Sequence, residues 1–293
     1  MKLSVNAEYL AHKYDDKTAF KMIKEAGFDA CDYSFFYMKY DENHWNNDDY
    51  KERACELKGY ADEIGLIINQ THAPFPAFRK NDDEMNVKMI PRIERSMEIA
   101  SILGAPHIVV HPIISYPDDV DVRAFNMDFL KGLIPTAKKF GIKIAIENTF
   151  GYDPKRDVII PTVCSFPDEI HSYIDELGDD VFIACLDTGH CTVVGTEPEI
   201  SIKALGGERL KALHVHDNNY KGDYHRLPYR GDINWDNVTK ALAEINYSGD
   251  FTFETDERPL EGFDEELYPT VLKYMHDVGR FLIKKIETHK NNI

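Results

Sequence analysis

The chain has 293 residues, a length that fits one large α/β domain or two ordinary ones, and 43% of its residues are hydrophobic, which is enough for a sizeable core. Its 34 basic and 51 acidic residues give a net charge of −17, which argues against a broad nucleic-acid-binding surface. No apolar run reaches the ~20 residues of a membrane helix, and residues 1–16 lack the apolar stretch of a signal peptide. We therefore expect a cytoplasmic protein with no membrane partner, whose five cysteines stay reduced.

Strand and helix patterns alternate along the whole chain. The predicted strands are eight short apolar segments at residues 2–6, 28–34, 66–72, 107–111, 142–147, 181–187, 210–216 and 250–256. A helical pattern follows each strand, at residues 16–27, 48–64, 84–103, 121–140, 166–178, 197–207, 233–245 and 264–286, the last with a bend expected at Pro269. The strands are apolar on both faces, as in a parallel sheet covered by helices. Eight such units favour a single α/β domain over residues 1–293, a closed (β/α)8 barrel rather than a doubly wound sheet.

Six of these strand segments carry, at or near their C-terminal end, a residue that can bind a metal ion. These residues are His72, His111, Glu147, Asp187, His216 and Glu254. The C-terminal ends of parallel barrel strands form one rim, and the longest predicted loops follow strands on that side. The sequence therefore predicts a metal site at the C-terminal face of the strands.

The central group of this predicted site is Glu147, Asp187, His216 and Glu254. Three carboxylates and one imidazole form a mostly oxygen ligand set that suits zinc, manganese, magnesium or cobalt. A single carboxylate at a strand end more often caps a helix or pairs with a basic residue. Four such residues on four consecutive strands favour a metal centre.

Two further groups extend the predicted rim. His72 and His111 are expected to bind a second metal or to contact substrate. His190, three residues after Asp187, could combine with Asp223 and His225 in a third group. The alternative is that His190 contacts substrate while Asp223 and His225 are ordinary loop residues.

Several residues in the rim loops are candidates for substrate binding. Phe75, Phe150 and Trp235 could form an apolar wall for a sugar, although packing within the loops is the alternative. Arg226 is a candidate contact for an anionic group, and its alternative is an ion pair with Asp223 or Asp232.

The segments IENTFG, CLDTGH, LHVHDN, DYH, RGDINW and FTFE resemble the xylose isomerase-like TIM barrel superfamily, from about His72 to Glu254. This superfamily includes sugar and sugar phosphate isomerases and epimerases, and also endonuclease IV. In ketose 3-epimerases, the positions that match Glu147, Asp187, His216 and Glu254 hold one divalent metal, and the two glutamates exchange a proton with the substrate. In endonuclease IV, nine similar positions bind three zinc ions. They match His72, His111, Glu147, Asp187, His190, His216, Asp223, His225 and Glu254.

The resemblance favours a divalent-metal-dependent isomerase or epimerase of carbohydrate metabolism, acting on a sugar or a sugar phosphate. Glu147 or Glu254 would remove a proton beside the carbonyl, and the other would return it by way of an enediolate. It implies one ion, with room for up to three, and a homo-oligomer would match the family.

The alternative is an endonuclease IV-like, metal-dependent phosphodiester hydrolase acting at abasic DNA. The acidic net charge argues against it, and Lys39 is the one lysine or arginine among residues 34–50. A non-catalytic sugar sensor is a third interpretation, but the sequence shows no partner domain for it.

Overall fold

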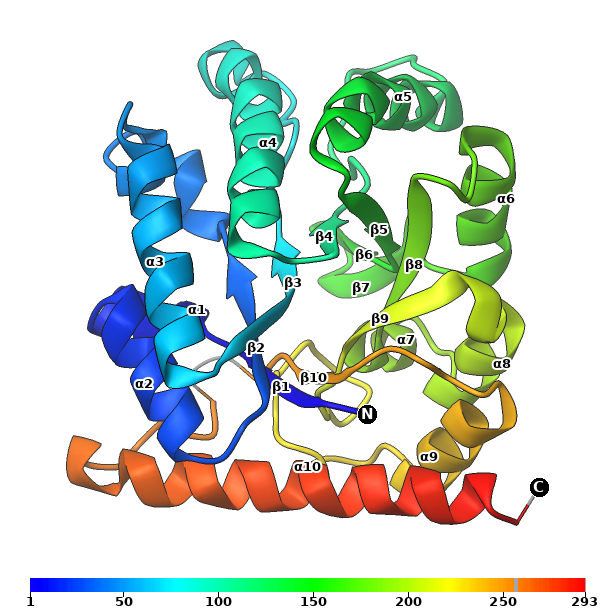
Figure 1. Ribbon diagram of the computed structural model, residues 1–293. Coiled ribbons are helices and arrows are strands. Elements are labelled where there is room, and N and C mark those ends of the chain that lie inside the picture. The colour runs from blue at the N-terminus through cyan, green and yellow to red at the C-terminus, as the bar shows by residue number, and fades with distance from the viewer. Residues whose placement is uncertain (256–257, 293) are drawn as a thin grey trace.

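Eight parallel strands form a closed barrel at the centre of the computed structural model, which describes residues 1–255 and 258–292 (Figure 1). Around the barrel the strands follow the order β10 (Phe251–Phe253), β1 (Leu3–Asn6), β2 (Ala30–Ser34), β3 (Ile67–His72), β4 (His107–Val110), β5 (Lys143–Glu147), β8 (Phe182–Asp187) and β9 (Leu210–His214). A parallel bridge between Val215 and Phe253 closes the ring. The predicted (β/α)8 barrel is confirmed. Asp256, the last residue of the eighth predicted strand, lies outside the described residues.

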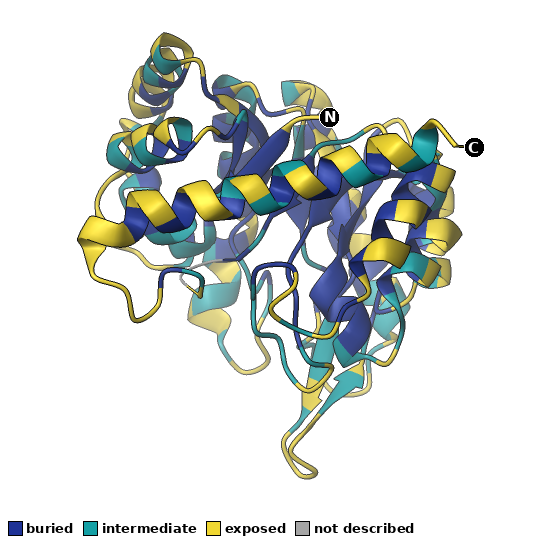
Figure 2. Cartoon of the chain, turned by 90° about the horizontal axis from the view of Figure 1, so that it is seen from below, coloured by how far each residue is buried: buried dark blue, intermediate teal, exposed yellow. Residues whose placement is uncertain are grey.

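Helices cover the outside of the barrel, and the structure contains all eight predicted ones. They are α2 (Asp16–Glu25), α3 (Tyr50–Ile64), α4 (Asp83–Leu103), α5 (Val122–Phe140), α6 (Pro167–Leu177), α8 (Pro198–Arg209), α9 (Trp235–Glu244) and α10 (Tyr268–Lys290). The bend expected at Pro269 is wrong, because α10 begins at Tyr268 and proline is tolerated in a first helical turn. In Figure 2, α10 runs straight across the barrel with its buried residues facing inward. None of the described helices is long and apolar enough to span a membrane.

The sequence patterns did not predict the short elements that follow the strands. They are α1 (Glu8–Lys13), α7 (Thr188–Val193), the 3-10 helices η1 (Phe36–Lys39), η2 (His44–Asn46) and η3 (Glu265–Leu267), and an antiparallel hairpin of β6 (Phe150–Asp153) and β7 (Val158–Pro161). The exposed tip of the hairpin, residues 154–157, extends away from the barrel (Figure 2). All of these elements lie in strand-to-helix connections, which in a parallel barrel form the rim at the C-terminal ends of the strands.

The inside of the barrel has an apolar part and a polar part. The apolar part is a buried cluster of Val109, Ala145, Ile183, Cys185 and Ala212 from β4, β5, β8 and β9. The polar part is buried as well and consists of Ser4, Asp32, Asn69, Gln70, His214 and Thr252. The polar part arises partly from a register shift between β2 and β3, which lets the consecutive residues Asn69 and Gln70 both contact Thr252.

Candidate active site

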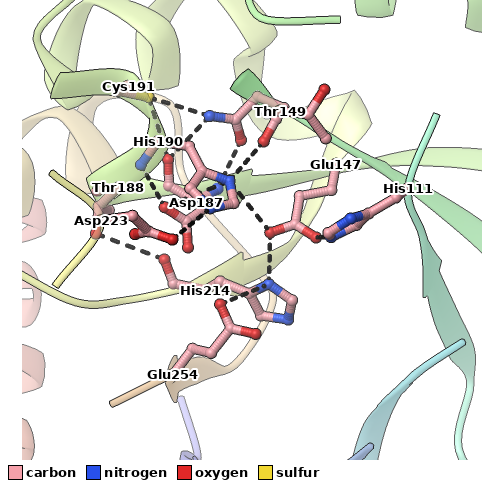
Figure 3. Close-up of polar contacts among 12 residues, drawn as sticks. His111, Glu147, Thr149, Asp187, Thr188, His190, Cys191, His214, Asp223 and Glu254 are labelled. Carbon is pink, nitrogen blue, oxygen red and sulfur yellow. Dashed lines mark hydrogen bonds and ion pairs between the residues drawn. The ribbon is translucent and has the colours of Figure 1, made fainter. Parts of the chain in front are cut away.

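Histidines and carboxylates from several strands meet around the buried side chain of Glu147 (Figure 3). The Nε2 atoms of His72 and His111 lie 3.1 Å apart. Glu147 Oε2 lies 2.8 Å from His111 Nε2 and 3.4 Å from His72 Nε2. Three possible metal-ligand atoms at the C-terminal ends of three neighbouring strands, β3 to β5, therefore lie within 3.4 Å of one another.

The two glutamates that are expected to be catalytic both lie close to His214, a histidine that was not predicted as a site residue. His214 Nδ1 lies 2.7 Å from Glu147 Oε1 and 3.3 Å from Glu254 Oε2. Only His216 of the segment HVH was predicted as a site residue. Residues two apart on a strand face the same side, so this segment carried a signal for both histidines.

A second group of donors gathers beside the first. His216 Nε2 lies 3.0 Å from Asp187 Oδ1 and 3.4 Å from Asp223 Oδ1. Asp223 Oδ2 lies 3.1 Å from His225 Nε2 and 3.5 Å from His190 Nε2. His190 Nδ1 lies 3.8 Å from carboxylate oxygens of both Glu147 and Asp187, and thus connects the two groups. All nine predicted histidines and carboxylates come together, and His214 lies among them.

The local structure of the segment DTGH explains how α7 enters the site. Asp187 caps α7 by accepting a hydrogen bond from the backbone N–H of His190 at 2.6 Å. Gly189 lies so close to the ring of His216 that a Cβ atom there would overlap it. Asn148 accepts from the backbone N–H of Asp187 at 2.7 Å and donates to its carbonyl oxygen at 3.0 Å. Asn148 thereby joins β5 to β8 at the site, a role that its residue type alone did not reveal.

The spacing of the donor atoms fits a divalent ion. Ions that bind their ligands at about 2.0–2.2 Å keep neighbouring donors roughly 3 Å apart, as His72, His111 and Glu147 are here. Several buried atoms of the site have no hydrogen-bond partner among the described residues, although some lie near a ring nitrogen. These atoms are Glu147 Oε2, Asp187 Oδ2, Asp223 Oδ1, and both ring nitrogens of His216. Buried polar atoms are rarely left in this way, so a cation is the group that they fit best.

Three of the histidines are also oriented as metal ligands usually are. His72, His190 and His225 each place Nδ1 2.7–2.9 Å from a backbone carbonyl oxygen. A proton on Nδ1 satisfies this contact and leaves Nε2 as the atom that faces a carboxylate of the site.

Burial and neighbouring charges drive the pKa values of the two central glutamates apart. Burial would raise the pKa of Glu147, but the imidazoles of His214 and His111 hold it well below its usual value. Burial raises the pKa of Glu254 well above its usual value; His214 opposes this shift and Glu147 adds to it. Burial also opposes a charge on His190, yet Asp187 and Asp223 raise its pKa to about 10. The positive charge that the carboxylates favour on His190 is one that a bound cation would replace.

A cavity of about 220 Å³ lies above these groups. Histidines and carboxylates line one part of it, and Phe75, Phe150, Ile113 and Ile114 line the rest together with prolines and Thr149. Phe75 and Phe150 therefore occupy the positions expected of an apolar wall.

The structure places the other two candidate substrate-binding residues away from this cavity. Trp235 is only 2% exposed, and its indole N–H donates to Asp217 Oδ2 at 2.9 Å, so it packs in the core at the start of α9. Arg226 lines a separate cavity with Arg230 and Arg258, and its guanidinium lies over the ring of Tyr224. Both expectations are corrected: a position in a rim loop does not determine which way a side chain points.

The model of one family, the xylose isomerase-like TIM barrel, matches residues 20–277. The chain belongs to this family. Among solved structures, the xylose isomerase-like barrel of this chain is similar to an L-ribulose 3-epimerase, with a TM-score of 0.75 and 16% identity over 99% of this chain and 96% of the other. It is also similar to a 3-keto-D-glucoside 4-epimerase from E. coli, with a TM-score of 0.71 and 18% identity over 94% and 99% of the two chains. At such identities the likeness shows the fold.

Curated relatives match part of the sequence. A D-psicose 3-epimerase from Enterocloster bolteae is 27% identical over 209 residues, which cover 68% of this chain and 65% of the relative. An inosose isomerase from Bacillus licheniformis is 24% identical over 179 residues, which cover 58% and 61%. The chain thus spans less than two thirds of the length of these relatives.

Proposed function

We propose that this protein is a divalent-metal-dependent isomerase or epimerase, which removes a proton from a carbon beside the carbonyl of a neutral sugar and returns one to the opposite face of that carbon or to the neighbouring carbon. The observation that carries the proposal is the meeting of Glu147 and Glu254 on His214, next to a cavity that both glutamates line. Two carboxylates that reach one small cavity from different strands can serve as the base and the acid of a proton transfer. The names of the relatives, which are sugar epimerases and isomerases, support the same class of reaction.

The residues of the two donor groups would divide the work. Glu147, Asp187, His216 and Glu254 would hold the ion, and a bound divalent ion would polarise the carbonyl and the adjacent hydroxyl of the sugar. One glutamate would take the proton from the carbon beside the carbonyl, and the other would return one to the enediolate. His190 lines the cavity and would hold a substrate hydroxyl. Phe75 and Phe150 would exclude water from the reacting carbons.

The lining of the cavity favours a neutral sugar over a sugar phosphate. No lysine or arginine is among its described lining residues, whereas a bound phosphate is normally held by such cations or by a helix N-terminus. Lys39 lies 5.9 Å from the centre of the Phe75 ring, and it does not line the cavity. A volume of about 220 Å³ suits one monosaccharide.

The first experiment is a turnover assay of metal-loaded protein with a panel of ketoses, aldoses and inososes, each with its phosphate ester where one exists. We expect turnover of at least one neutral sugar and a kcat/KM at least about tenfold lower for its phosphate ester. Selective turnover of a phosphate ester would contradict the choice of a neutral substrate.

A second candidate function is phosphodiester hydrolysis at abasic sites, which one specific observation favours. The nine clustered histidines and carboxylates form several neighbouring groups that could each hold an ion, including His72, His111 and Glu147, and also His216, Asp223 and His225. Multiple ions suit hydrolysis, because they activate water and hold the leaving oxygen. Cleavage of an abasic-site duplex, with three bound ions and no sugar turnover, would favour hydrolysis over proton transfer as the function.

A further inference from the structure

A second cavity, which shares no lining residue with the active-site cavity, gathers three arginines. This arginine cavity has a volume of about 790 Å³ and lies between the loops after β9 and β10 and the start of α10. Arg226 and Arg230 belong to the first loop, and Arg258 belongs to the second. Because like charges repel one another, three cations around one hollow are unexpected in a chain with a net charge of −17, unless an anion binds there.

Two of these arginines have no acidic partner. The guanidinium groups of Arg226 and Arg230 make no ion pair and no hydrogen bond with any residue that the structure describes. The guanidinium of Arg226 lies 4.7 Å from the centre of the Tyr224 ring, a contact that orients the group and leaves its N–H donors available. Arg258 pairs with Glu261 at 3.2 Å, and both side chains are exposed, so this ion pair is weak. Glu261 therefore offsets one of the three charges and leaves two for a ligand.

The loop that carries Arg226 and Arg230 is held in place by a buried carboxylate. Asp217 is 0% exposed, and its side chain accepts hydrogen bonds from the backbone N–H groups of Tyr229 and Ile233 at 2.9 and 3.1 Å. The backbones of Asp217 and Arg226 also pair in an antiparallel bridge. Tyr229 has a φ of 72°, a conformation that is unfavourable for residues other than glycine, and its bond to Asp217 helps to maintain it. The two arginines are thus presented by an ordered loop, which lowers the entropic cost of binding a ligand.

The lining of the arginine cavity defines the kind of ligand that fits it. A guanidinium group binds phosphate through two parallel N–H donors, and two such groups suit its double charge. The other walls are apolar and aromatic: Phe263 and Tyr274 are 49% and 52% exposed beside the buried Leu227 and Val271. Exposed aromatic rings offer faces on which a flat group can stack.

We propose that the arginine cavity binds a phosphate ester that carries a flat ring, the chemistry of a mononucleotide. Arg226 and Arg230 hold the phosphate, and Phe263 and Tyr274 contact the ring. The volume of about 790 Å³ accommodates a ligand of this size, whereas the active-site cavity has about 220 Å³. Binding does not depend on the proposed function, because none of the expected metal ligands lines the arginine cavity.

The test is a calorimetric titration of the full chain, loaded with zinc and freed of excess ion, with three probes. The probes are adenosine monophosphate, adenosine and inorganic phosphate. We expect adenosine monophosphate to bind with a dissociation constant below about 1 mM. Adenosine and inorganic phosphate should bind at least about tenfold more weakly, because each lacks one of the two recognised parts. Equal affinity for adenosine, or no binding of adenosine monophosphate at millimolar concentrations, would overturn the proposal.

Variants of the two unpaired arginines locate the binding site. Arg226→Gln and Arg230→Gln should each weaken the binding of adenosine monophosphate about fivefold to tenfold. Arg230 is exposed, so Arg230→Gln should fold as the wild type does, and it decides the test if Arg226→Gln is unstable. The matched control is Arg53→Gln, which removes one positive charge from an exposed side chain of α3 and should leave the affinity unchanged. Unchanged affinity in the folded Arg230→Gln protein would overturn the proposal.

The remaining outcomes separate this site from the metal centre and from nucleic acid. Loss of adenosine monophosphate binding in Glu147→Gln, with full affinity in both arginine variants, would place the phosphate on the metal centre and overturn the proposal. Tighter binding of an abasic-site DNA duplex, weakened by Arg230→Gln, would assign the arginines to nucleic acid and overturn it as well. The expected pattern in a protein that turns over no sugar would support the arginine cavity and remove only the proposed function.

Discussion

The two ends of the barrel are built for different purposes. At the C-terminal ends of the strands, nine predicted histidines and carboxylates crowd together, and several of their buried atoms have no hydrogen-bond partner in the part of the chain that the structure describes. At the N-terminal ends, short turns join helices to strands, and glycines such as Gly65 and Gly104 end the helices in the left-handed conformation. Residues at the C-terminal end of the barrel are arranged to bind a ligand, at a cost in folding stability. Residues at the N-terminal end stabilise the fold. Substitutions at the two ends should therefore have separable effects.

The largest expected effect is on turnover at the glutamates. Glu147→Gln and Glu254→Gln should each lower kcat by about 10³-fold or more, because each variant removes a group that transfers a proton. The melting temperature should fall for Glu147→Gln, since the change leaves the buried imidazoles of His111 and His214 without the carboxylate that balances them. The measurement is steady-state kinetics together with a thermal melt.

The matched control for these variants is Glu84→Gln, at a side chain that is 84% exposed on α4. It should leave both quantities unchanged. Full turnover by either site variant would remove that glutamate from the acid–base pair.

A smaller loss of activity is expected from Gly189→Ala. The added Cβ would overlap the ring of His216, so either α7 or the ring must shift. A misplaced site residue can lower kcat about 10²-fold. Gly132→Ala in α5 is the control, because nothing lies within 4 Å of the added carbon there, and it should keep full activity with slightly raised stability. Equal activity of the two variants would mean that His216 is not needed.

Removal of the ion should affect stability as well as activity. An ion present at 100 times its dissociation constant stabilises the folded state by about 2.7 kcal/mol, which corresponds to roughly 5 °C in the melting temperature of a chain of this size. A chelator should lower the melting temperature by this amount, and added ion should restore it. In Glu147→Gln the shift should shrink. An identical shift in wild type and variant would place the ion elsewhere.

The smallest effect is expected at the opposite end of the barrel. Gly104 ends α4 with a φ of 84°, and a Cβ atom there would lie 3.2 Å from Lys58 Cε. Gly104→Ala should therefore lower the free energy of unfolding by about 1 kcal/mol. Because this position is remote from the site, kcat and KM should not change. Denaturant unfolding and kinetics on the same sample would check this, and a clear loss of turnover would break the separation between the two ends.

The fold could be predicted from the sequence because each barrel unit is encoded locally. Every predicted strand and helix is present, since apolar strands and helix-ending glycines mark the units without reference to tertiary structure. The hairpin of β6 and β7 was missed because its residues are exposed or half-buried, so its sequence lacks the regular apolar pattern of a buried strand.

The site could be predicted only in part. Glu147, Asp187 and Glu254 were found because strand ends of a parallel barrel share one rim. His214 was missed because the last histidine of HVH was taken to be the one at the strand end, whereas β9 ends at His214. Trp235 was misplaced because its burial depends on Asp217, whose hydrogen bonds to the loop exist only in the folded chain.

The most direct test of the proton-transfer account is turnover in D₂O, followed by proton NMR of the product and of the recovered substrate. We predict that deuterium appears at the carbon next to the carbonyl, that Glu147→Gln and Glu254→Gln abolish its appearance, and that Glu84→Gln does not. Conversion of a sugar with no deuterium at that carbon would contradict the account, because the hydrogen would then move without exchanging through the two carboxylates.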